Sequence, residues 1–207
     1  MRRRLLGVAV VATTLLLAAC ASSEPGSTKP TFGSGGGPTS TVAPDELVAA
    51  KQAAGIEDCP DVSGAAAADL PDVTLDCLGG GTPVDLARLT GRPTVINLWA
   101  SWCIECRTEL PLLARADAAM GDEVQFLGID FKDESPDRAI ALAQASGVTY
   151  PQLSDPDQRT VGSFKVVGLP QTIFVDAQGT MVATERAAYR SYADLAAAIE
   201  RHLGVTP

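Results

Sequence analysis

The fold of this chain is decided by one stretch, residues 97 to 107, which reads Asn97-Leu98-Trp99-Ala100-Ser101-Trp102-Cys103-Ile104-Glu105-Cys106-Arg107. An apolar run over residues 94–100 predicts a buried strand, and a helical pattern begins at Cys103. Two cysteines separated by two residues therefore lie where a strand passes into a helix. This arrangement is typical of a redox-active pair, Cys103 and Cys106.

The spacing of the two cysteines has a chemical reason. Their sulfurs can meet across one helical turn, so they can form a disulfide and open again as a dithiol. The helix start favours a thiolate at Cys103, through unpaired backbone N–H groups and the positive end of the helix dipole. We therefore expect Cys103 to attack a partner's disulfide, with its sulfur left partly exposed beside Trp102. The more buried Cys106 then resolves the mixed disulfide.

The Trp-Cys-x-x-Cys motif that begins at Trp102, after an apolar strand, resembles thioredoxin. Asn97 narrows the resemblance, because thioredoxin itself has a buried Asp at this point, whereas the extracytoplasmic TlpA/ResA-like branch usually has Asn. Glu109 and Pro111 also match that branch. The resemblance covers residues 70–203. It implies an α/β, thioredoxin-like fold with a central mixed β-sheet flanked by helices, here with an N-terminal extension.

The resemblance also implies roles for acidic residues near the cysteines. Glu109 matches a glutamate that related proteins place beside the dithiol, where it exchanges a proton with Cys106 or tunes the pair. Helical spacing puts Glu105 and Glu109 on one face, so the alternative is a solvated helix residue. The charge of Glu105 opposes thiolate formation, which predicts a pKa for Cys103 near that of an ordinary thiol and a reducing role.

Substrate-binding residues are implied in the same way. Pro170 matches the family's cis-proline, which faces the active-site pair. A cis bond turns the backbone of Leu169 toward an incoming chain, and its N–H and C=O can then hold a substrate strand. An ordinary turn proline is the alternative. Trp99 and Trp102 are expected to form a hydrophobic wall near the site, although Trp99 also suits the core.

Composition excludes several classes of partner. The chain has 207 residues, 46% of them apolar, with 16 basic and 25 acidic side chains. Loss of three of the 16 basic residues with an N-terminal signal leaves 13 against 25 acidic ones, a net charge of −12. Such an acidic chain does not suit nucleic acid or electrostatic attachment to anionic lipid. Membrane contact would therefore need a lipid anchor.

The N-terminal region predicts a targeting signal and a tether. Residues 1–19 contain three arginines followed by an uncharged run, which predicts a signal peptide too short to span a bilayer. The residues that end at Cys20 resemble a bacterial lipobox, which implies cleavage before Cys20 and lipidation of its sulfur. A plain signal peptide with an incidental cysteine is the alternative. Residues 20–44, rich in Ser, Thr, Gly and Pro, are expected to form a flexible linker.

The folded part is expected to begin with an extension over residues 45–69, which carries a short helix, followed by a thioredoxin-like domain over residues 70–207. Cys59 and Cys77 are expected to form a structural disulfide in an oxidising compartment. A second redox pair is the alternative, less favoured because neither cysteine opens a helix. No metal site is expected, because zinc needs four suitably spaced ligands and His202 is the single histidine.

Hydrophobic periodicity and turn residues predict the remaining elements. Helices are expected over residues 44–54, 103–120, 135–146 and 191–203. Strands are expected over residues 73–78, 94–100, 124–131, 173–175 and 181–183. Pro111 lies inside the second helix and removes one backbone hydrogen bond, which predicts a kink there.

Together these features predict a membrane-anchored thiol–disulfide oxidoreductase on the extracytoplasmic face of the bacterial cell membrane. Its redox group would be the Cys103–Cys106 disulfide, with no other cofactor. The resemblance implies reduction of disulfides in client proteins, such as apocytochrome c during cytochrome c maturation. It also implies re-reduction by a membrane thiol transporter.

Two other functions stay open at this point. The first is a general disulfide oxidant or isomerase, which the reduction potential of the cysteine pair would distinguish. The second is a Cu(I)-binding module, since soft thiolates suit Cu(I), although no Met-rich or His-rich segment accompanies the cysteines. Peroxide reduction is not expected, because a peroxidatic cysteine would need its own loop motif, which the sequence lacks.

Overall fold

The computed structural model of the protein describes residues 42–121 and 123–206, which all lie in one compact unit over residues 37–207. The predicted signal peptide, the lipidation of Cys20 and most of the predicted linker fall outside the described residues. Within the described ranges, every helix is too short or too polar to cross a bilayer.

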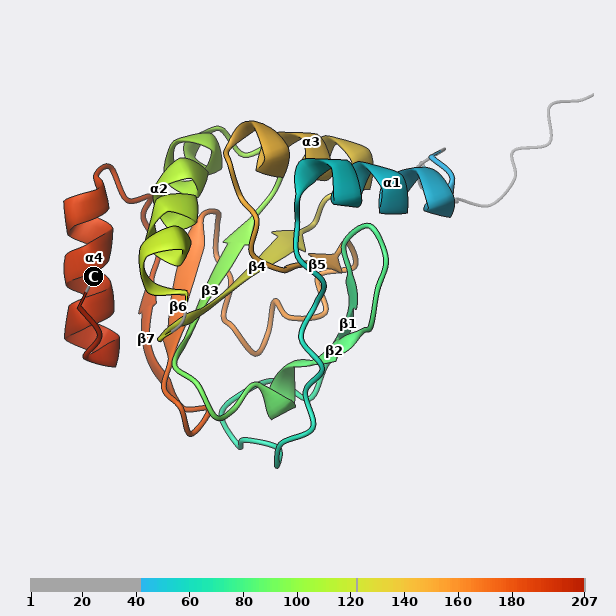
Figure 1. The fold of residues 1–207 in the computed structure, drawn as a ribbon. Helices are drawn as coiled ribbons and strands as arrows, with labels where there is room; N and C mark the ends of the chain where they lie inside the picture. Colours follow the sequence, from blue (N-terminus) through green and yellow to red (C-terminus); the bar gives the residue numbers. More distant parts are fainter. Residues whose placement is uncertain (1–41, 122, 207) are drawn as a thin grey trace, which may run out of the picture. The chain divides into compact units, whose positions relative to one another are not determined.

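A seven-stranded mixed sheet forms the centre of this unit (Figure 1). Its order is β2-β1-β5-β4-β3-β6-β7. The strands are β1 (Thr74–Cys77), β2 (Val84–Asp85), β3 (Thr94–Trp99), β4 (Gln125–Phe131), β5 (Gln152–Asp155), β6 (Gln171–Val175) and β7 (Met181–Glu185). Strand β4 is parallel to both of its neighbours, β3 and β5. The other pairings are antiparallel: β6 with β3 and β7, and β1 with β2 and β5. This is the mixed sheet that the thioredoxin resemblance implies.

Over the described residues, four α-helices and one 3₁₀ turn accompany the sheet. They are α1 (Pro44–Ala54), η1 (Leu86–Arg88), α2 (Ile104–Met120), α3 (Pro136–Ala145) and α4 (Tyr192–Leu203). Proline at the first helical position begins α1 and α3, where its missing N–H has no helical partner to lose. Ser191 caps α4 by accepting the N–H of Asp194 at 3.2 Å. Helix α1 packs beside α3, and α2 beside α4 (Figure 1).

Strand β3 separates two hydrophobic cores, because successive side chains of a strand point to opposite faces. Val95 and Trp99 join the core to which α2, α3 and α4 contribute their apolar faces. Ile96 and Leu98 join the second core, which the segment leading into β1 and the loop before β6 cover. All six residues of β3 are buried, as the apolar run predicts.

The predicted helices and strands are present, with ends that differ by at most two residues. The short β2 was missed, and so was a second strand, β5. It begins after Pro151 and contains Gln152, Ser154 and Asp155, so it has neither an apolar run nor β-branched residues. Its pairing with β4 and β1 on both sides makes this polar segment a central strand. Tertiary pairing therefore overrides local propensity there.

Candidate active site

The cysteine pair lies at the start of α2, directly beyond the end of β3. Cys103 and Cys106 are joined by a disulfide, with Cα atoms 5.4 Å apart. Cys103 is the N-cap residue of α2, and the N–H of Cys106 donates to its sulfur at 3.2 Å. One of the unpaired N–H groups of the helix start is therefore directed at Cys103 Sγ. Such a donor stabilises negative charge on this sulfur once the disulfide opens.

The sulfur of Cys103 is less exposed than expected. The residue is only 4% exposed, and Cys106 is fully buried. In the disulfide the Cys103 sulfur is bonded to that of Cys106, which belongs to the core beneath α2. The neighbouring Trp102 and Ile104 project into solvent instead. The disulfide therefore lies beneath an exposed apolar rim of two side chains.

The loop that carries the cysteines is fixed by the loop after β4. The N–H of Ser101 donates to Asp133 Oδ2 at 2.6 Å, and the indole N–H of Trp102 donates to the Lys132 carbonyl at 3.0 Å. Arg107 donates from α2 to the Ser101 carbonyl at 3.0 Å. Because these bonds hold both sides of the loop, Cys103 is presented in one orientation. Nothing in the local sequence pattern singles out Asp133 for this role.

Glu109 is the buried member of the two helix carboxylates. It is 1% exposed, whereas Glu105 lies in solvent. Asn97 Nδ2 donates to its Oε2 at 2.9 Å, and the Tyr189 backbone N–H donates to its Oε1 at 3.2 Å. Burial raises the pKa of Glu109 to about 7, although the two hydrogen bonds oppose the shift. A carboxyl with this pKa both accepts and releases a proton near neutral pH.

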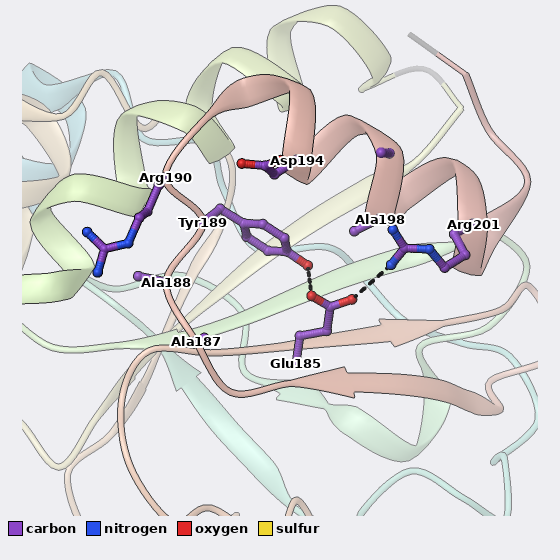
Figure 2. Close-up of a pocket in the computed structure, with 9 residues that line it drawn as sticks. Glu185, Ala187, Ala188, Tyr189, Arg190, Asp194, Ala198 and Arg201 are labelled. Carbon is purple, nitrogen blue, oxygen red and sulfur yellow. Dashed lines mark hydrogen bonds and ion pairs between the residues drawn. The ribbon is translucent and has the colours of Figure 1, made fainter.

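The segment that supplies Tyr189 is held by a polar cluster at the end of β7 (Figure 2). The Tyr189 hydroxyl donates to Glu185 Oε2 at 2.8 Å. Glu185 also contacts Arg201 at 3.5 Å and His202 at 2.9 Å, both on α4. Glu185, Tyr189 and Arg201 border an open pocket of about 380 Å³. The cluster fixes the backbone of residue 189 against Glu109. Its members come from separate elements, so no local sequence pattern predicts it.

Pro170 lies beside the cysteine-bearing end of β3. Residue Gln171, the first of β6, pairs with Leu98 in the antiparallel register, so Pro170 is placed next to the end of β3. The Leu169–Pro170 peptide bond is cis, as the resemblance implies. Leu169 is half-buried and packs against the core that contains the two cysteines. Its backbone is therefore close to the edge from which Cys103 emerges.

Trp99 belongs to the core rather than to the surface of the site. It is fully buried, and its indole N–H donates to Gln152 Oε1 at 2.9 Å. Opposite Trp99 in the β3–β4 register lies Asp130, which is also fully buried. Burial, and secondly the nearby Asp133 carboxyl, raise the pKa of Asp130 well above its usual range. The apolar pattern of the β4 strand concealed this buried carboxyl.

The second cysteine pair lies away from the first. Cys59 and Cys77 are joined by a disulfide, with Cα atoms 5.9 Å apart. This bridge ties the segment before β1 to the last residue of β1. Among the residues that the structure describes, no three His, Cys, Asp or Glu side chains gather in a way that could hold a metal ion.

Comparison with known proteins places this geometry in a family. Residues 66–184 match the AhpC/TSA family. The chain is 33% identical over 111 residues to the thiol:disulfide interchange protein DsbE of Pseudomonas fluorescens, which covers 54% of this chain and 61% of that protein. It is 34% identical over 116 residues to the thiol:disulfide interchange protein HelX of Rhodobacter capsulatus, which covers 55% of this chain and 64% of that protein. The chain thus spans less than two-thirds of the length of these relatives.

A solved structure extends the likeness to the fold. A secreted disulfide oxidoreductase of Mycobacterium tuberculosis, homologous to DsbE, superposes with a TM-score of 0.57 at 27% identity. The superposition covers 63% of this chain and 96% of that one. The central sheet, the cysteine pair at the start of α2 and the family match over more than half of the chain agree with one another. This chain therefore belongs to the AhpC/TSA family and has a thioredoxin-like fold.

Proposed function

We propose that this protein is an extracytoplasmic thiol–disulfide oxidoreductase that reduces disulfides of client proteins through Cys103 and Cys106. The observation that carries the proposal is the position of the pair. The Cys103 sulfur caps α2 and accepts the N–H of Cys106, so it is the better stabilised thiolate when the disulfide is open. The names of the relatives, thiol:disulfide interchange proteins, support the same reaction class.

The reaction has two exchange steps. The Cys103 thiolate attacks one sulfur of the client disulfide; the client's S–S bond breaks, and its second sulfur leaves as a thiolate. The Cys106 thiol then loses its proton and attacks Cys103 Sγ in the mixed disulfide. The first client sulfur leaves with the electron pair, so the client gains two electrons and the Cys103–Cys106 disulfide forms.

Glu109 is proposed to take the proton from Cys106 in the second step. It lies one helical turn after Cys106 on the same buried side of α2. Its pKa of about 7 leaves a large fraction of the carboxylate free to accept a proton at neutral pH. Its two hydrogen bonds, from Asn97 and Tyr189, hold the carboxylate in place during the transfer.

The client is proposed to bind over the exposed rim and along the cis-proline. Trp102 and Ile104 offer apolar surface on either side of Cys103. The backbone N–H and C=O of Leu169, next to cis Pro170, can pair with an extended client segment. The charge of Glu105, exposed in the first turn of α2, opposes thiolate formation and favours a reductant over a strong oxidant.

The wider setting is also a proposal. Reduced clients would include apocytochrome c during cytochrome c maturation, and a membrane thiol transporter would restore the dithiol. Residues 1–19 would direct export, and lipid on Cys20 would hold the protein on the outer face of the cell membrane. Substituting Cys20→Ser should release the protein from the membrane fraction; unchanged membrane attachment would argue against the anchor.

Trapping tests the exchange mechanism. Cys106→Ser should accumulate disulfide-linked client adducts on Cys103, because the second step cannot occur. The matched control is the double variant Cys103→Ser/Cys106→Ser, which should trap nothing. Adducts at equal levels in both variants, or in neither, would contradict the proposal.

Two solution measurements separate the remaining alternatives. A reduction potential well below about −180 mV fits a reductant, and a higher value fits an oxidant or isomerase. Titration of the reduced protein with Cu(I) addresses a copper-binding role. Stoichiometric tight binding together with loss of client reduction would favour the copper module instead.

A further inference from the structure

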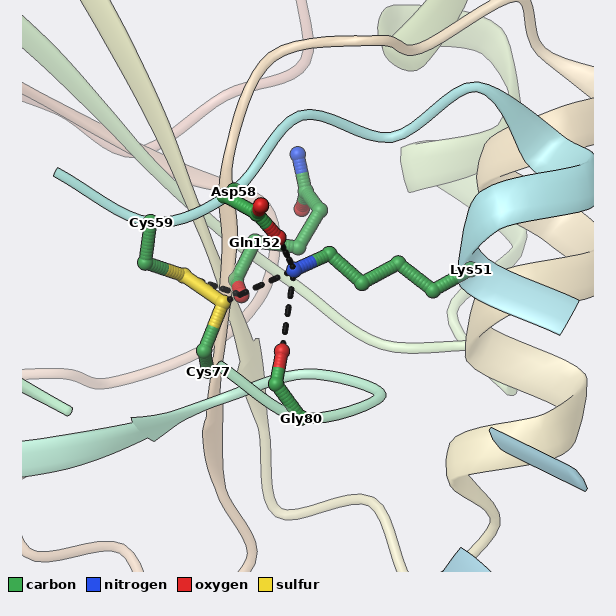
Figure 3. Close-up of polar contacts among 6 residues, drawn as sticks. All are labelled: Lys51, Asp58, Cys59, Cys77, Gly80 and Gln152. Atoms are coloured by element: carbon green, nitrogen blue, oxygen red, sulfur yellow. Dashed lines mark hydrogen bonds and ion pairs between the residues drawn. A yellow bond between two sulfur atoms is a disulfide. The ribbon is translucent and has the colours of Figure 1, made fainter. Parts of the chain in front are cut away.

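A buried lysine contacts the second disulfide (Figure 3). Lys51 is 3% exposed and is the buried residue of α1. Its Nζ lies 3.3 Å from Cys77 Sγ, 2.9 Å from the Gly80 carbonyl and 2.8 Å from Asp58 Oδ1. The Asp58 side chain is 92% exposed, so water weakens this ion pair. A cation is therefore held against a sulfur that, as part of a disulfide, carries no charge.

The two sulfurs have different neighbours, and both neighbours suit the reduced state. Cys59 Sγ lies 3.4 Å from the Gln152 carbonyl oxygen. In the disulfide this sulfur has no hydrogen to donate, but a Cys59 thiol would donate to that carbonyl. Cys77 Sγ, in turn, would become an anion against the Lys51 ammonium. The site thus holds an acceptor for one thiol and a cation for one thiolate.

We propose that Cys59–Cys77 is a second redox-active disulfide, in which Lys51 stabilises Cys77 as the leaving thiolate. A thiolate with a cationic neighbour forms more readily and leaves faster. The expectation of a purely structural bridge rested on the absence of a helix start, and Lys51 supplies the positive charge by another route. This inference is independent of the reaction proposed for Cys103 and Cys106.

The reductant of this site is a protein dithiol or a small dithiol. Its thiolate attacks Cys59 Sγ, the Cys59–Cys77 bond breaks, and the electron pair goes to Cys77 Sγ beside Lys51. The second thiol of the reductant loses its proton and attacks its own sulfur in the mixed disulfide, which releases Cys59. Cys59 takes one proton and the other goes to solvent, so the reductant ends as a disulfide and this pair as thiol and thiolate.

Access to the pair is comparable with that of the first site. Cys59 is 7% exposed, slightly more than Cys103 in its own disulfide. A mainly apolar pocket of about 260 Å³ adjoins Cys77 and is bordered by Gly79 and Gly80. These glycines have positive φ, and a side chain on Gly79 would meet the Lys51 side chain. The bare backbone of this turn therefore leaves room for the lysine beside Cys77.

The second pair is separate from the first in space. Cys77 pairs with Leu153 on β5, Leu153 with Ile129 on β4, and Ile129 with Leu98 on β3. Three strand spacings, about 14 Å, separate Cys77 from β3. Direct exchange between the two disulfides within one chain is thus excluded in this fold. Electrons must reach Cys59–Cys77 from another molecule.

The test uses the full chain with Cys103→Ser/Cys106→Ser, so its outcome does not depend on the reaction proposed for the first pair. The protein is equilibrated at pH 8.5 with mixtures of reduced and oxidised dithiothreitol, and free thiols are counted by alkylation and mass. With Lys51→Met added, half-reduction should need about a tenfold higher ratio of reduced to oxidised dithiothreitol. Lys51→Arg should bring this ratio most of the way back to that of the protein with Lys51. The exposed-lysine control, Lys165→Met, should leave the ratio unchanged.

Two results would overturn the inference. One is that the protein with Lys51 and the Lys51→Met variant reach half-reduction at the same ratio of reduced to oxidised dithiothreitol. The other is reduction that occurs only when circular dichroism shows unfolding. If Lys51→Met does not fold, the protein that keeps Lys51 still tests the inference. In its reduced, folded state, alkylation of Cys77 should be half-maximal at a pH below the ordinary thiol pKa of about 8.5. Alkylation centred at or above that pH would also refute the role of Lys51.

Discussion

The carboxyl of Glu109 should make the stability of this protein fall as the pH rises, and Glu109→Gln should remove that fall. The pKa of Glu109 is raised from 4.5 to about 7 in the folded protein, mainly by burial. Folding therefore favours the protonated carboxyl of Glu109. The stability that this protonated carboxyl contributes is lost as the pH rises from 4.5 through 7. A shift of this size corresponds to about 3 kcal/mol of unfolding free energy at pH 8.5.

The substitution should fit the site with little rearrangement. The amide oxygen of the new side chain can still accept the Tyr189 N–H, as Glu109 Oε1 does now. Its amide N–H needs an acceptor, and Asn97 Oδ1 is buried without a hydrogen-bond partner. A turn of the Asn97 amide would bring this oxygen to the new donor. Any remaining cost is independent of pH, so the pH dependence isolates the carboxyl.

Urea unfolding of the oxidised protein at pH 4, 7 and 8.5 measures the effect. The unfolding free energy of Glu109→Gln, relative to the parent protein, should rise by about 3 kcal/mol from pH 4 to pH 8.5. Glu105→Gln, at an exposed position of the same helix, is the matched control and should show no such rise. In thiol exchange, the step near pH 7 should disappear in Glu109→Gln alone. Parallel stability curves for Glu109→Gln and the parent would refute the reasoning.

Three further substitutions test how the site is supported. Gly128→Ala would place a methyl group against the Gln152 side-chain oxygen and should lower the unfolding free energy by about 2 kcal/mol in urea titrations. Asp133→Ala would leave the buried Ser101 N–H without its acceptor; we expect a loss of about 2 kcal/mol and faster hydrogen exchange at that amide. Ser191→Ala removes the cap of α4 and should cost about 1 kcal/mol in thermal unfolding while the reduction potential stays unchanged. Unaltered stability in any of the three would contradict the corresponding contact.

Local patterns predicted those parts of the fold that depend on nearby residues. The apolar run of β3 and the cysteine spacing at the start of α2 are such patterns, and both elements form where expected. Strand β5 was missed because its residues are polar, and only its pairing on both sides makes it a strand. A sequence pattern registers the preferences of neighbours along the chain, whereas pairing depends on distant segments.

The sequence by itself determined that Cys103 and Cys106 meet at a helix start, because one helical turn sets their separation. Which carboxylate serves them was decided only by the tertiary structure: Glu105 and Glu109 share a helix face, yet Glu109 alone is covered and bonded by Tyr189, 80 residues away in the chain. The same holds for Lys51, which reaches Cys77 across 26 residues. Burial and distant partners set the free energy of a charge, and neither is encoded in the spacing of adjacent residues.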